Sequence, residues 1–68
     1  QRKYKARVRR NAEETKKLEA ELDEIAAALA DESKQSDYVL MNELYERQQA
    51  AETRLMELYE EAESFVEN

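Results

Sequence analysis

Asp31-Glu32-Ser33-Lys34-Gln35-Ser36-Asp37 is a run of seven polar residues near the middle of a 68-residue chain. On each side of it, mostly apolar residues recur at alternating spacings of four and three, the pattern of a helix that packs along a second helix. The two seams consist of Tyr4, Val8, Asn11, Thr15, Leu18, Leu22, Ile25 and Leu29, and of Met41, Leu44, Gln48, Ala51, Leu55, Leu58, Ala62 and Phe65. The sequence therefore predicts an all-α fold, a two-helix antiparallel coiled-coil hairpin.

The polar run sets the expected boundaries. One helical hairpin is expected to occupy residues 1–68, with helix one at about 2–30, a turn at 31–37 and helix two at about 37–66. Either Ser36 or Asp37 is suited to cap the second helix, because a short side-chain oxygen accepts from backbone N–H groups of the first turn. A single continuous helix is the alternative, but its seam would have to pass through polar residues of the run, so the hairpin is favoured.

The charges beside the two seams predict how the helices align. If Leu22 faces Leu44, the flanking pairs are all opposite in charge: Arg7 with Glu61, Glu14 with Arg54, and Glu21 with Arg47. A shift of one helix by seven residues would set Glu14 against Glu61, which is repulsive. Exposed ion pairs contribute only about 0.2–1 kcal/mol each, so these pairs select an alignment more than they stabilise it.

Residue types that are absent limit the possible chemistry. The chain has no Gly, Pro, Cys or His, which excludes the familiar zinc, iron–sulfur and thiol sites as well as histidine-based catalysis. We therefore expect no catalytic residues, no cofactor and no metal in this chain, and no enzymatic activity. No apolar run approaches the ~20 residues that span a bilayer, and we expect no signal peptide. A cytoplasmic protein without membrane contact is expected.

Charge is distributed unevenly along the chain. The net charge is −6, but residues 1–10 carry six basic and no acidic side chains, which leaves −12 on the remainder. Basic clusters of this kind can neutralise nucleic-acid phosphates. The candidate nucleic-acid-binding residues are the four at outward heptad positions, Arg2, Lys3, Arg9 and Arg10, with Tyr4 available to stack on a base. In the alternative interpretation the cluster only balances the acidic end of helix two, which contains Glu57, Glu60, Glu61, Glu63 and Glu67.

Large apolar side chains also lie beside the second seam. They are Tyr38, Tyr45, Met56 and Tyr59. The favoured interpretation is that they cover the edge of the core by packing over Ala12, Ala26 and their neighbours. The other is that the Tyr38/Tyr45/Tyr59 side binds a second hairpin, making a homo-oligomer, or a parent domain.

Three segments resemble the C-terminal extension of ABC-F ATP-binding cassette proteins. They are Leu29-Ala30-Asp31, Ser36-Asp37-Tyr38-Val39-Leu40-Met41-Asn42-Glu43-Leu44 and Glu57-Leu58-Tyr59-Glu60-Glu61. In that family a helical hairpin follows the second nucleotide-binding domain, and its first arm begins with Lys and Arg. Two positions differ, since Glu32 stands where the family often has Pro and Ala62 where a Trp is common.

The resemblance implies a function for the hairpin and for a larger parent protein. The parent would be a cytoplasmic ATPase that acts on the ribosome, and ATP would bind to its nucleotide-binding domains rather than to this hairpin. The hairpin would be an accessory coiled coil that contacts ribosomal RNA or DNA through its basic end. The competing interpretation is a purely structural coiled coil, acting as a spacer or a dimerisation module.

Overall fold

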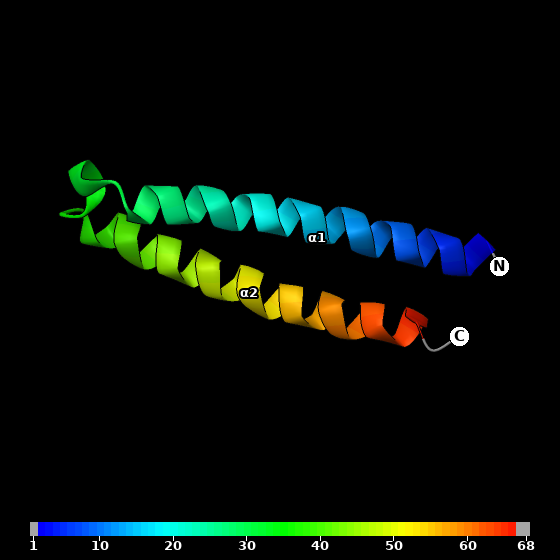
Figure 1. Cartoon of the computed structure of the whole chain (residues 1–68). Helices are drawn as coiled ribbons and strands as arrows, with labels where there is room; N and C mark the ends of the chain where they lie inside the picture. Colours follow the sequence, from blue (N-terminus) through cyan, green and yellow to red (C-terminus); the bar gives the residue numbers. More distant parts are fainter. Residues whose placement is uncertain (1, 67–68) are drawn as a thin grey trace.

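Two long helices lie side by side and run in opposite directions (Figure 1). The computed structural model describes the backbone of residues 2–66 and the side chains of residues 4–65. Its elements are α1 (Arg2–Leu29), the short 3-10 helix η1 (Glu32–Lys34) and α2 (Tyr38–Val66). The rod measures 51 × 14 × 14 Å. The predicted all-α antiparallel hairpin is confirmed, and the continuous helix is excluded.

The connection between the helices is built without glycine, and no described residue has a positive φ. After α1 ends at Leu29, the Asp31 carboxylate accepts hydrogen bonds from the backbone N–H and the hydroxyl of Ser33, at 3.0 and 2.7 Å. These bonds start η1, a tight turn that reverses the chain. Asp37 then caps α2, because its side chain accepts from the backbone N–H of Leu40 at 3.1 Å. Polar side chains thus supply the turn geometry that Gly or Pro often provides.

The buried residues all belong to the two predicted seams. The buried apolar side chains are Ile25, Met41, Leu44, Ala51, Leu55 and Leu58, and Asn11 is the buried polar residue among the described residues. Ile25 and Leu58 are the least accessible, with 1% and 2% of their surface exposed. Tyr4 and Val8, at the open end, remain 38% and 37% exposed. The core is therefore a single narrow seam that becomes thinner toward the start of α1.

Two interhelical ion pairs define the alignment of the helices. Arg54 contacts Glu14 at 2.7 Å, and Arg47 contacts Glu21 at 3.5 Å. Both were predicted from the sequence. The third expected pair, between Arg7 and Glu61, is not among the ion pairs of the described residues, and both side chains have other contacts.

The aromatic side chains beside the second seam stay in contact with solvent. Tyr38, Tyr45, Met56 and Tyr59 are 77%, 57%, 63% and 47% exposed, and Ala12 and Ala26 are exposed as well. The expectation that these side chains cover the core edge within one chain is therefore wrong. In a two-helix rod the core side chains already fill the space between the helices, so a residue beside the seam has no third element to pack against.

Candidate nucleic-acid interface

The basic run occupies the first turns of α1. The side chains of Lys5, Arg7, Arg9 and Arg10 are exposed. The side chains of Arg2 and Lys3, which were also predicted to bind nucleic acid, lie outside the described residues. Because α1 is one straight helix here, the cations project in several directions around it rather than from a single face.

Arg7 is used within the hairpin. Its guanidinium carbon lies 5.6 Å from the centre of the Phe65 ring, a cation–π contact that joins the start of α1 to the end of α2. The Phe65 ring also meets Tyr4 edge to face, at 5.7 Å between ring centres and 82° between ring planes. The Tyr4 hydroxyl donates to the Phe65 carbonyl at 2.7 Å. These contacts close the open end of the hairpin and hold Tyr4 and Arg7 in place.

A groove of about 340 Å³ opens beside this aromatic pair. It is lined by Tyr4, Lys5, Val8, Arg9 and Phe65. The lining is mainly apolar, with Tyr4, Val8 and Phe65 as its apolar side chains, and the cationic residues Lys5 and Arg9 complete it. Such a surface suits a ligand that has both a flat ring and an anionic group, which describes a nucleotide. The seam periodicity predicted Tyr4, Val8 and Phe65 to be core residues. They are partly exposed to solvent because the core is thinner at this end of the hairpin.

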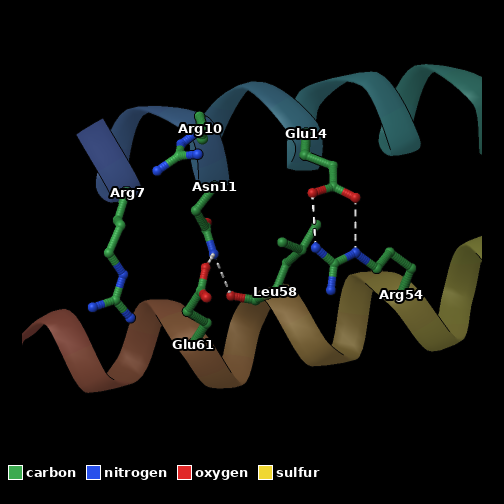
Figure 2. A pocket seen from close by; sticks show the side chains of 7 residues that line it. All are labelled: Arg7, Arg10, Asn11, Glu14, Arg54, Leu58 and Glu61. Carbon is green, nitrogen blue, oxygen red and sulfur yellow. Dashed lines mark hydrogen bonds and ion pairs between the residues drawn. The ribbon is translucent and has the colours of Figure 1, made fainter. Parts of the chain in front are cut away.

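A second depression, of about 380 Å³, lies on the side of the rod where α1 and α2 exchange polar contacts. Figure 2 shows Arg7, Arg10, Asn11 and Glu14 extending from α1, opposite Arg54, Leu58 and Glu61 of α2. The amide nitrogen of Asn11 donates to the Leu58 carbonyl at 2.8 Å and to the Glu61 carboxylate at 3.0 Å. Asn11 therefore binds the Glu61 carboxylate, which was predicted to pair with Arg7.

Arg54 is the most strongly paired side chain of this depression. Its Nε and Nη2 donate to the two carboxylate oxygens of Glu14, at 2.7 and 2.9 Å, and its Nη1 donates to Glu57 at 3.2 Å. The hydrogen bonds from Arg54 lower the pKa of Glu14 below its ordinary value of 4.5, and the same bonds raise the pKa of Arg54. Arg54 is therefore committed to the hairpin itself and is a poor candidate for contact with an external anion.

Arg9 and Arg10 differ from Arg7 and Arg54. Among the described residues, no ion pair joins either of them to α2. Two of the five acidic residues expected to balance them have other contacts: Glu57 pairs with Arg54, and Glu61 accepts from Asn11. Lys16 and Lys17 follow Arg9 and Arg10 by one heptad, are exposed, and extend the basic surface along α1. Sequence analysis did not include this second pair, although its seven-residue spacing is the signal for it.

The described part of the chain lacks a metal site and a membrane-spanning helix. It contains no group of three or more acidic residues placed to hold a metal ion. None of its helices combines the length and the apolar character needed to cross a bilayer. Comparison with known proteins found no matching family model, no similar curated protein and no similar solved structure.

Proposed function

We propose that this hairpin is an accessory coiled coil that contacts the phosphate backbone of RNA or DNA through the start of α1, with Arg2, Lys3, Arg9 and Arg10 as the contact residues. The observation that carries the proposal is the exposure of Arg9 and Arg10 and their lack of an acidic partner among the described residues. Both are exposed, and among the described residues neither is ion-paired with the acidic helix beside it. Cations held on a rigid helix without an acidic partner are free to replace the counterions of a phosphate backbone.

Internal charge balance explains the basic cluster less well. If the cluster served only to attract α2, its arginines would pair with the acidic residues opposite them. Instead the interhelical ion pairs of the described residues lie farther along α1, at Glu14 and Glu21. Arg7 lies over the Phe65 ring, and Lys5, Arg9 and Arg10 form no ion pair with the described part of α2, so these three cations stay available to a partner.

The groove between Lys5 and Arg9 supports the same assignment. A backbone phosphate can be held by these two cations while the adjacent base rests on the apolar side chains of Tyr4, Val8 and Phe65. Base stacking of this kind accepts every base, because each has a flat face. We therefore expect binding without strong sequence preference.

The resemblance to the C-terminal extension of ABC-F proteins agrees with this proposal. It points to ribosomal RNA as the natural partner, and to a parent ATPase whose nucleotide-binding domains bind the ATP. In that setting the hairpin extends the reach of the parent by the length of the rod and presents its basic end to the ribosome.

Salt dependence and charge removal test the proposal together. Wild-type hairpin is compared with a variant carrying Arg2→Gln, Lys3→Gln, Arg9→Gln and Arg10→Gln, by fluorescence anisotropy with labelled RNA and DNA at several salt concentrations. We expect wild-type affinity to fall steeply as salt rises, and the slope of log K against log salt to shrink by about 3–4 in the variant. Circular dichroism should show unchanged helix content, since Arg7 and Arg54 are retained.

A matched pair of double variants locates the contact. The first double variant is Arg9→Gln with Arg10→Gln, and the second is Lys16→Gln with Lys17→Gln. Each removes two positive charges, and the two pairs occupy the same heptad positions in successive repeats of α1. The first pair should weaken binding more than the second, because it is closer to the groove. Equal binding by wild type and the quadruple variant, or no binding by either at low salt, would contradict the proposal and favour a purely structural spacer.

A further inference from the structure

One edge of the rod is apolar and open to solvent. On α2 it presents the exposed side chains Tyr38, Tyr45, Met56 and Tyr59, and on α1 the exposed Ala12 and Ala26. We call these six residues the tyrosine edge. The Tyr59 hydroxyl donates to the Glu19 carboxylate at 3.0 Å, which places Glu19 on this edge. Ala12 and Ala26 lie seven residues before and after Glu19, two helical turns away in each direction, so they share its face.

The opposite edge of the rod has a different character. It carries the interhelical contacts of Glu14 with Arg54, Glu21 with Arg47 and Asn11 with Glu61. Polar side chains there are paired across the helices and need no further partner. The tyrosine edge has one such contact, from Tyr59, and otherwise exposes large side chains. Several large apolar side chains exposed along one edge are a feature of interaction sites.

The charge of the chain divides along the length of the rod. Residues 18–51, which form the half nearest the turn, carry nine acidic and two basic side chains, a formal charge of −7. Residues 1–17 and 52–68, which form the other half, carry eight acidic and nine basic side chains, a formal charge of +1. Two rods lying side by side in the same direction would bring the two −7 halves together. In opposite directions, each −7 half lies along a +1 half, which is the arrangement that electrostatics favours.

The dimensions of the rod are sufficient for a stable contact between two copies. The outline of one whole face, 51 by 14 Å, measures roughly 700 Å², so burial of most of that face would approach the ~800 Å² per partner of standard protein interfaces. Two paired hairpins would also form a four-helix bundle. In such a bundle the side chains beside each seam pack against a third helix, which the isolated rod lacks.

From the exposed edge, the charge division and the area, we infer that the tyrosine edge binds a second copy of this chain in antiparallel orientation. The two-fold axis passes α2 near residues 50 and 51, where the charge of the chain divides. This symmetry sets Tyr45 of one copy opposite Met56 of the other, an aromatic–thioether contact. It also sets Gln49 opposite Glu52, so that the amide donates to the carboxylate and no like charges of α2 meet at the axis. The inference goes beyond nucleic-acid contact, because none of these residues belongs to the basic end of α1.

The inference is tested by sedimentation equilibrium over a range of protein concentrations. Wild type is expected to pass from monomer to dimer as concentration rises. Tyr45→Lys with Met56→Lys should weaken dimerisation at least tenfold. The matched control, Ala50→Lys with Thr53→Lys, adds the same charge to exposed positions of the same helix away from the tyrosine edge, and should change the dimerisation constant less than threefold. Circular dichroism on both variants checks that the hairpin stays folded.

Single cysteines test the orientation, since the native chain has none. The Tyr45→Cys and Met56→Cys proteins should each form few disulfides alone and form them readily when mixed. A wild type that stays monomeric to millimolar concentration, or equal weakening by the two lysine variants, would overturn the inference. Ready disulfide formation by either cysteine protein alone would overturn the antiparallel arrangement. The Arg9→Gln/Arg10→Gln variant keeps the whole tyrosine edge and should still dimerise, more weakly than wild type only by the charge removed, which keeps this test separate from nucleic-acid binding.

Discussion

Arg54 of α2 holds Glu14 of α1 through two parallel hydrogen bonds, from Nε at 2.7 Å and from Nη2 at 2.9 Å. The two residues are forty positions apart in the sequence. The planar guanidinium matches the two carboxylate oxygens, so the contact specifies distance and direction as well as charge. A shift of either helix by one heptad would break both bonds. This pair, with Glu21 and Arg47 two turns nearer to the connection, fixes the alignment of the rod.

The Glu14–Arg54 pair predicts a pH dependence. Hydrogen bonds from Arg54 lower the pKa of Glu14 below 4.5 in the folded protein. A lowered folded-state pKa stabilises the fold above the unfolded value, and this contribution is lost as pH falls through the lowered pKa. Glu14→Gln should therefore melt at a lower temperature than wild type at pH 7, and the difference should vanish in strong acid. Thermal melts followed by circular dichroism between pH 7 and pH 2 measure this. Glu13→Gln is the control, and a difference for Glu14→Gln that persists at pH 2 would contradict the argument.

Engineered disulfides should report the alignment directly. We expect Leu22→Cys with Leu44→Cys to form an intramolecular disulfide readily, because the observed ion pairs place these seam positions opposite one another. Leu22→Cys with Ala51→Cys should react poorly, since seven residues correspond to ~10 Å along a helix. The disulfide yield under mild oxidation, measured by mass spectrometry after trypsin digestion, compares the two. Preferential disulfide formation by the 22/51 pair would mean that the two helices are shifted by seven residues from the observed alignment, and would contradict it.

Truncation of the most buried side chain should strongly destabilise so narrow a core. Ile25 is 1% exposed and packs with Met41 and Leu44. Ile25→Ala should lower the free energy of unfolding by roughly 2–5 kcal/mol, enough to unfold much of the population of a small hairpin. Urea denaturation followed by circular dichroism measures the change. Val39→Ala removes a side chain that is 79% exposed and should have little effect; similar losses for the two variants would show that the seam is not the source of stability.

One buried hydroxyl offers a route to a more stable hairpin. The Thr15 Oγ1 is buried and has no hydrogen-bond partner among the described residues. Thr15→Val keeps the branched shape and removes the desolvated hydroxyl, so it should stabilise the fold by about 1 kcal/mol. The same exchange at the exposed Thr53 controls for helix propensity and should give no comparable gain. Equal melting temperatures for wild type and Thr15→Val would mean that the hydroxyl finds a partner in solution.

The sequence by itself determined the all-α hairpin and the alignment of its helices. Seam spacing is a property of each helix alone, so it can be read without knowing what the helix contacts. The polar run from Asp31 to Asp37 interrupts that spacing and therefore marks the turn. The pairs of Glu14 with Arg54 and Glu21 with Arg47 followed because one alignment brings opposite charges together.

Only the tertiary structure decided which side chains are left without a partner. Asn11 takes the Glu61 carboxylate, and Arg7 lies over the Phe65 ring, because a short amide within the seam reaches α2 at that level while the long arginine extends past it. The tyrosines beside the second seam face solvent, since two helices enclose one line of side chains and no more. Periodicity locates a residue around its own helix axis. Whether another atom stands opposite that residue depends on how the two helices meet. This is why the folded hairpin was needed to show that Arg9 and Arg10 form no ion pair with the described part of α2 and that the tyrosine edge stays exposed.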